Sequence, residues 1–176
     1  MKKVTIVLSL FIVLFASAFT VMELVNWKIK ESAYTISFKG GKVEGTLKGL
    51  KATILFDDAS PEKSKISALI DVNTLSTGKG MMDKHAKSEG ALDAERYNFI
   101  SFESAGVSKV ATGYEAKGKL TIKGVAKEIT LPFTYENKGT EAVFNGKLSI
   151  VPKDYGITRM GTPDKLDIEI SIPVTK

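Results

Sequence analysis

The chain has 176 residues, with 25 Lys and Arg against 20 Asp and Glu and no cysteine. This length suits one domain with its own hydrophobic core. The lack of cysteine excludes disulfides, thiol catalysis and cysteine metal ligands. Without residues 1–18, which hold two lysines and no acidic residue, the balance is 23 − 20 = +3. Both signs alternate along the chain, so the clustered cations of a nucleic-acid surface are not expected.

Residues 1–18 have the layout of a secretory signal peptide. Two lysines precede an apolar run that ends at Phe15, and Ala16-Ser17-Ala18 offers small residues for cleavage after Ala18. We therefore expect a mature domain of residues 19–176, periplasmic or secreted, with no stable membrane insertion. An uncleaved membrane anchor is the alternative, because Phe19 to Met22 lengthen the apolar run toward that of a transmembrane span.

Apolar and polar residues alternate along most of the remaining chain. In the segment 119–135, Leu120 and Ile122 alternate with polar residues, a turn follows at Gly124, and the alternation resumes at Ile129. Successive side chains of a strand point to opposite faces, so the pattern predicts strands with one apolar face. It predicts nine strands: 34–38, 43–47, 52–56, 66–72, 100–102, 114–122, 129–135, 142–150 and 166–174.

The segment 78–96 interrupts the alternation. It is rich in Met, Ala, Lys and Glu and has no β-branched residue, which predicts one or two short helices. Eight or nine sequential strands with one apolar face bury that face best when the sheet closes on itself. We predict an all-β fold, an antiparallel eight-stranded β-barrel with a short helical insert around residues 78–96.

Small residues occupy many inward positions: Gly45, Ala52, Ala68, Ala116, Gly118, Ala142 and Gly146. An eight-stranded barrel has room for its own side chains or for one small ligand. Small inward residues favour a cavity. Alternatively, they mark bulges and bends in a solid core.

Four motifs in order resemble the YceI-like family of secreted lipid-binding proteins. The first, within Val43 to Asp58, contains Gly45, Leu47, Ala52, Ile54, Phe56 and Asp57. The second contains Asp83, His85, Ser88, Leu92, Asp93 and Tyr97. The third is LTIKGVAKEITLP at residues 120–132, and the fourth is Asp154-Tyr155-Gly156-Ile157. The resemblance spans roughly Trp27 to Val174.

This resemblance implies a lipocalin-like barrel whose apolar tunnel holds a polyisoprenoid or a related long-chain amphiphile. The expected tunnel lining consists of apolar inward residues, namely Phe38, Leu47, Ile54, Phe56, Ile70, Val72, Ile100, Phe102, Leu120, Leu131, Phe133, Phe144 and Leu148. His85 and Arg159 are candidates for a head-group contact at the mouth, since a planar guanidinium suits a phosphate. Alternatively, His85 is a structural helix-end residue and Arg159 forms a surface pair with Asp154 or Asp164.

The residue types argue against an enzyme. His85 is the only histidine, which leaves too few ligands for a metal site, and Asp57-Asp58 lie in a turn where local hydrogen bonds explain them. We expect a non-enzymatic lipid carrier without cofactor, metal or nucleic-acid partner, either a monomer or a homodimer. The rival interpretation is a stress or interaction protein with a filled barrel. An outer-membrane barrel is a third, disfavoured by the resemblance and by the short strands.

Overall fold

The computed structural model describes residues 24–176, so the predicted signal peptide lies outside the described residues. Ten strands form one antiparallel sheet in the order β1-β4-β5-β6-β7-β8-β9-β10-β2-β3. Their bounds are β1 Asn26–Ile29, β2 Thr35–Gly40, β3 Val43–Leu47, β4 Leu50–Leu55, β5 Lys65–Asp71, β6 Phe99–Val110, β7 Gly113–Ile122, β8 Val125–Lys138, β9 Glu141–Ile150 and β10 Leu166–Thr175.

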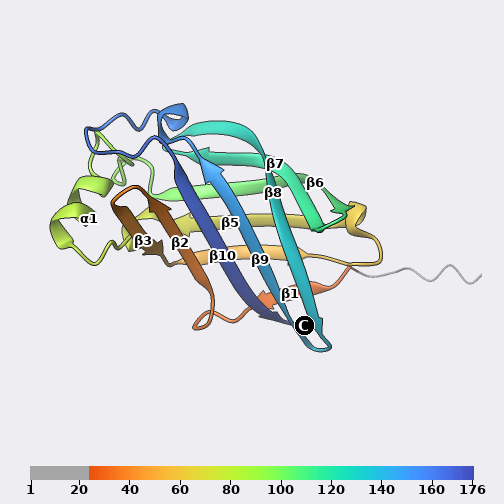
Figure 1. Cartoon of the computed structure of the whole chain (residues 1–176). Helices are drawn as coiled ribbons and strands as arrows, with labels where there is room; N and C mark the ends of the chain where they lie inside the picture. Colours follow the sequence, from red (N-terminus) through yellow and green to blue (C-terminus); the bar gives the residue numbers. More distant parts are fainter. Residues whose placement is uncertain (1–23) are drawn as a thin grey trace, which may run out of the picture.

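Eight of these strands close into a barrel. β1 pairs with β10 through Lys28 and Thr175, and with β4 through Trp27 and Ile54. This short strand therefore joins the two ends of the row that runs from β4 to β10. The predicted closed antiparallel eight-stranded barrel is confirmed (Figure 1).

The β2–β3 hairpin extends the barrel wall beside β10. β2 pairs with the first half of β10, where Phe38 faces Ile168, and β3 is the edge strand. No strand described here pairs with β4 between Leu50 and Thr53 on the side away from β5. We call this gap between β3 and β4 the seam. The backbone N–H of Leu50 donates there to the Tyr34 hydroxyl at 3.0 Å.

All nine predicted strands are present, with three differences. β1 was not predicted, because four residues are too few to show an alternation. The short strand expected at 100–102 continues to Val110. The strand expected over 66–72 ends at Asp71, where the side chain caps the 3-10 helix η2 (Val72–Thr74) by accepting from the Asn73 N–H.

The predicted helical insert is a single α-helix, α1, at Gly80–Lys87. Turns follow it, including one in which the Tyr97 N–H donates to the Asp93 carbonyl at 2.8 Å. The two 3-10 helices η1 (Pro61–Lys63) and η3 (Pro152–Tyr155) complete the elements. No helix within residues 24–176 is long and apolar enough to cross a membrane.

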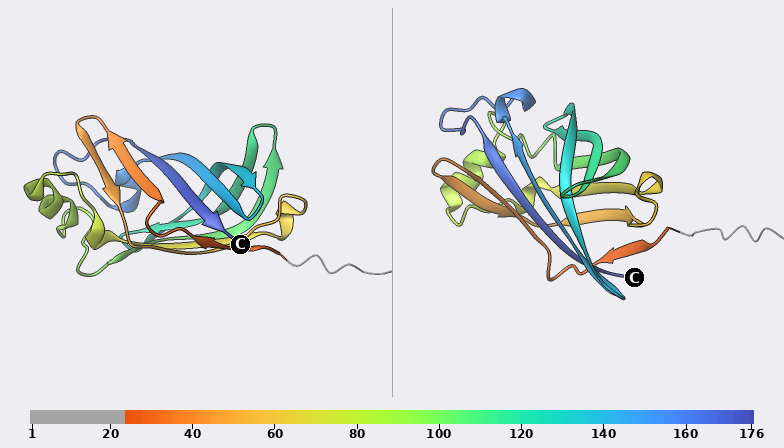
Figure 2. Two further views of the ribbon diagram at one scale, coloured as in Figure 1. Left: turned by 90° about the horizontal axis from the view of Figure 1, so that it is seen from below. Right: turned by 45° about the vertical axis from the view of Figure 1, so that its right-hand side comes forward.

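The barrel has two different ends (Figure 2). α1, the β2–β3 turn and η3 lie at one end, which we call the α1 end. The β4–β5 loop and the β6–β7 turn lie at the opposite end.

Candidate functional site

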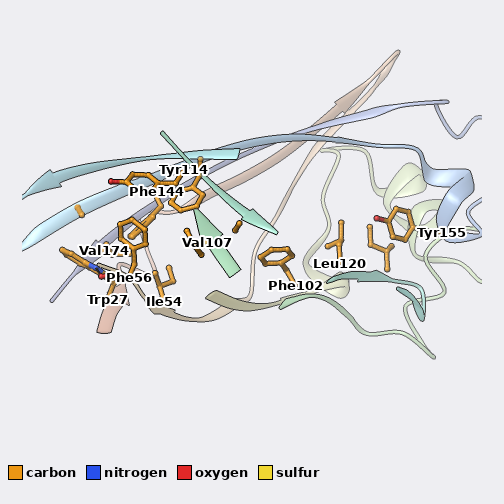
Figure 3. Packing of buried hydrophobic residues seen from close by; sticks show 14 of the residues in the cluster. Trp27, Ile54, Phe56, Phe102, Val107, Tyr114, Leu120, Phe144, Tyr155 and Val174 are labelled. Carbon is orange, nitrogen blue, oxygen red and sulfur yellow. Dashed lines mark hydrogen bonds between the residues drawn. The ribbon is translucent and has the colours of Figure 1, made fainter. Parts of the chain in front are cut away.

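Six aromatic side chains fill the interior opposite the α1 end. The aromatic cluster consists of Trp27, Phe56, Tyr114, Phe133, Tyr135 and Phe144, with ring centroids 4.8–6.3 Å apart. Figure 3 shows its labelled members gathered on one side, with Phe102 and Leu120 lying between them and Tyr155. Edge-to-face and stacked pairs of this kind add to the stability gained from burial.

Phe56 is the centre of the aromatic cluster. It contacts four of the other rings and is only 1% exposed. Burial, followed by the carboxylate of Asp58, raises the pKa of Tyr135 to about 12. Burial also raises the pKa of Tyr114 above its ordinary value. Burial among these rings therefore disfavours the phenolate form of both tyrosines.

Between the aromatic cluster and the α1 end lies a cavity of about 160 Å³. We call it the barrel cavity. Its lining is wholly apolar, made of Ile, Leu, Ala and one ring, Phe102. The volume is close to that of an engineered apolar cavity of ~150 Å³ that stays dry and binds benzene. A space without polar partners cannot hold water well but can hold hydrocarbon.

Partial exposure of inward side chains gives independent evidence of this space. Ile70, Ile100, Ile150 and Ile168 point inward but are only partly buried. In a close-packed interior such side chains would have almost no accessible surface. Their exposure therefore faces the barrel cavity.

The predicted tunnel residues fall into four groups. Eight line the barrel cavity: Leu47, Ile54, Ile70, Ile100, Phe102, Leu120, Leu131 and Leu148. Phe56, Phe133 and Phe144 belong to the aromatic cluster instead. Phe38 lines a separate pocket at the α1 end, and Val72 is buried in η2 and lines neither space.

Eleven further lining residues were not predicted as tunnel lining, although Ala52 and Ala68 were expected to point inward. They are Ile36, Leu50, Ala52, Ile66, Ala68, Ile122, Ile129, Ile150, Ile168, Ile170 and Ile172. Nearly all lie at inward positions of the predicted alternations. The alternation therefore already placed these isoleucines on the inward face, but it does not show which inward residues border a space.

The four inward alanines divide between the two regions. Ala52 and Ala68 face each other across β4 and β5 and line the barrel cavity. Ala116 and Ala142 are at most 1% exposed and pack with the aromatic cluster. The argument from small residues to a cavity therefore holds for the first pair, whereas the second pair leaves room for rings.

A second pocket, of about 300 Å³, opens at the α1 end. We call it the mouth pocket. It brings together His85 on α1 and Arg159 in the loop before β10, the two residues predicted for a head-group contact. Phe38 and Leu75 of its lining share one packed cluster with Leu47 and Leu50 of the barrel cavity. A layer of apolar side chains thus separates the two spaces.

The Arg159 guanidinium has N–H groups that can donate to a ligand. One guanidinium nitrogen, Nη1, donates to the Ser88 hydroxyl at 3.3 Å. No carboxylate among the described residues lies within 4 Å of Arg159, and Asp164 pairs with Lys153 instead. The Ser88 hydroxyl in turn donates to the His85 carbonyl at 2.8 Å and so closes the end of α1.

A second contact anchors the start of α1. The Asp83 carboxylate accepts from the Thr77 hydroxyl at 2.6 Å and from the Thr77 N–H at 2.7 Å. These hydrogen bonds lower the pKa of Asp83 below its ordinary value. While Asp83 is ionised, these hydrogen bonds fix the start of α1 at the α1 end of the barrel.

The acidic side chains predicted to make local hydrogen bonds can be placed directly. No group of three His, Cys, Asp or Glu that could hold a metal ion occurs among residues 24–176. Asp57 accepts from the Ala59 N–H at 2.9 Å, which is the local turn bond expected for it. The described side chains leave no buried nitrogen or oxygen without a hydrogen-bond partner.

Comparisons with known proteins agree with this architecture. The family model of the YceI-like domain matches residues 27–174. The UPF0312 protein of Serratia proteamaculans is 34% identical over 140 residues, which cover 74% of this chain and 71% of that protein. A UPF0312 protein of Pseudomonas putida is 31% identical over 160 residues, with coverages of 86% and 80%.

Solved structures show the same barrel. BcnA of Burkholderia cenocepacia has a TM-score of 0.77 at 26% identity and covers 84% of this chain and 100% of its own. A polyisoprenoid binding domain from Saccharophagus degradans, implicated in plant cell wall breakdown, has a TM-score of 0.63 at 12% identity. It covers 87% of this chain and 99% of its own, and at this identity the likeness concerns the fold.

Proposed function

Because the chain belongs to the YceI-like family, we propose that it is a non-enzymatic binder of a long-chain amphiphile, a polyisoprenoid or a related lipid. The barrel cavity carries this proposal, since a wholly apolar space inside a barrel suits a hydrocarbon chain and little else. The polyisoprenoid binding domain from Saccharophagus degradans shares the fold, which supports the ligand class.

The ligand's polar end would lie in the mouth pocket. Arg159 can donate a second hydrogen bond there, and His85 lines the same pocket. The apolar tail of an amphiphile would then lie among the apolar side chains of the barrel cavity, and its polar head would lie near Arg159. To join the two spaces, the side chains of Phe38 and Leu75 must move aside.

We also propose that residues 1–18 are removed as a signal peptide and that the domain acts in the periplasm or outside the cell. The charged start, the apolar run and the Ala16-Ser17-Ala18 site support this. Intact-mass measurement of the protein from its own host tests it. The expected chain begins at Phe19, whereas a retained Met1 would contradict the proposal.

Ligand binding is tested by extracting the protein, purified without detergent from its host, and identifying the extract by mass spectrometry. A prenyl or acyl lipid in a fixed ratio to protein is the expected result. Adding a polyprenol to delipidated protein should raise Tm by about 5–10 °C at a hundredfold excess over Kd. No lipid in the extract and no shift in Tm would favour the filled-barrel interpretation instead.

A matched pair of variants ties the lipid to the barrel cavity. Ala68→Phe adds a ring inside the cavity, whereas Ser67→Phe adds the same ring to the outer face of the same strand. Both should fold, and only Ala68→Phe should lose the lipid and the shift in Tm. Equal binding by both variants would place the ligand elsewhere.

A further inference from the structure

The inward face of two strands changes from aliphatic to aromatic at one step. Ile54 of β4 lines the barrel cavity, and Phe56, two residues further along the chain and just past the end of β4, belongs to the aromatic cluster. On β8, Leu131 and Phe133 repeat this change. The rings of Phe56 and Phe133 lie 5.8 Å apart, centroid to centroid, so the two changes meet inside the barrel.

The aromatic cluster is closely packed at this level. Phe56 is 1% exposed and Phe133 7%, and Ala116 and Val174, which pack in the same part of the core, are fully buried. Most isoleucines of the barrel cavity, in contrast, keep accessible surface, although Ile36, Ile54 and Ile122 are buried. A chain that enters from the α1 end would therefore pass Ile54 and Leu131 of the lining and then meet the rings of Phe56 and Phe133.

We propose that Phe56 and Phe133 form the floor of the binding site and set the length of hydrocarbon chain that the barrel accepts. The inference rests on the proposed function, because it concerns the ligand of the same cavity. Affinity should rise about fourfold for each CH₂ group that is buried, until the chain reaches the floor. Further CH₂ groups stay at the mouth and add nothing.

The floor can be moved by conservative substitutions. Leu has three fewer side-chain carbons than Phe, so Phe56→Leu or Phe133→Leu should deepen the cavity by about two to three CH₂ groups while keeping an apolar core. Leu131→Phe places a ring one step closer to the α1 end and should shorten the cavity. Two deepening variants and one shortening variant keep the test valid if one of them fails to fold.

Phe102→Leu is the matched control. Phe102 is the only ring in the lining of the barrel cavity, and it lies in the side wall, paired with Ala68 on β5 and Leu120 on β7. The same substitution there widens the cavity without deepening it. It should change the affinity for all chain lengths together and leave the limiting length unchanged.

The experiment measures how n-alkanols of increasing length displace the fluorescent probe N-phenyl-1-naphthylamine from delipidated protein. For the unsubstituted protein, the affinity for the alkanol should rise with the length of its carbon chain and then level off. The levelling point should move to longer chains in Phe56→Leu and Phe133→Leu, to shorter chains in Leu131→Phe, and not at all in Phe102→Leu. Circular dichroism confirms that each variant is folded.

Two failures have different meanings. In the first, alkanols bind while the levelling point stays fixed in both deepening variants, or moves equally in Phe102→Leu. Either result would contradict the proposal that Phe56 and Phe133 form the floor, and the proposed function would stand. If no alkanol of any length displaces the probe and none raises Tm, the proposed function itself fails, and the floor with it.

Discussion

The two halves of the barrel interior use the same alternation for different purposes. Near Phe56 the inward side chains are rings set beside Ala116 and Ala142, and together they fill the space. Near Ile70 they are aliphatic chains around the barrel cavity, and many keep accessible surface. The packed aromatic half therefore provides the stability that allows the half around the barrel cavity to remain hollow.

The largest expected difference between the halves is the effect of deleting a side chain. Phe56→Ala should lower the free energy of unfolding by about 3–5 kcal/mol, because its ring touches four others in a closed core. Leu148→Ala should cost about 1–2 kcal/mol, since Leu148 already faces a space. Urea unfolding monitored by Trp27 fluorescence measures both. Equal losses would remove the distinction between the halves.

Adding volume should likewise destabilise the aromatic half more than the half that contains the barrel cavity. Ala116→Leu forces three carbons into a site with 0% exposure and should destabilise the protein by about 1–3 kcal/mol. Ala52→Leu fills part of the barrel cavity, so its stability should stay within about 0.5 kcal/mol of the natural sequence. Unfolding curves of the two variants provide the test. A strongly destabilised Ala52→Leu would mean that the barrel cavity is not free space.

Tyr34 is expected to stabilise the seam at the hollow half. Tyr34→Phe keeps the ring but removes the hydroxyl that accepts from the Leu50 N–H, which should cost about 1–2 kcal/mol. Hydrogen exchange of the Leu50 amide should become faster in this variant, while exchange in the paired strand β7 stays unchanged. An unaltered Leu50 amide would show that the seam is held by other contacts.

An effect confined to alkaline pH is a pH dependence of the aromatic half. The pKa of Tyr135 is raised to about 12 from 10.0, so the unfolded chain loses this proton first as pH rises. The resulting stability is fully present below pH 10 and is lost between pH 10 and about 12. Tyr135→Phe should flatten this alkaline loss in part, since Tyr114 also has a raised pKa. Unfolding curves from pH 9 to 12 that are identical for both proteins would contradict the assignment.

The sequence predicted the barrel because alternation is a local property that survives in every strand from β2 to β10. It did not predict β1, since closure through Trp27 and Lys28 depends on partners far along the chain. Nor could it separate Phe133, in the aromatic cluster, from Leu131, in the cavity lining, because both point inward. Which inward side chains meet a partner is decided by the register between strands.

The most direct test of the hollow half is methyl NMR of protein labelled at Ile, Leu and Val, titrated with a prenyl alcohol. We expect the methyl signals of Ile70, Ile100 and Ile168, which line the barrel cavity, to shift in a saturable way. Val107 and Val174 are 4% and 0% exposed and lie in the part of the core that contains the aromatic cluster. Their methyl signals should not shift. Unchanged isoleucine signals at saturating ligand, or equal shifts in both groups, would contradict the account.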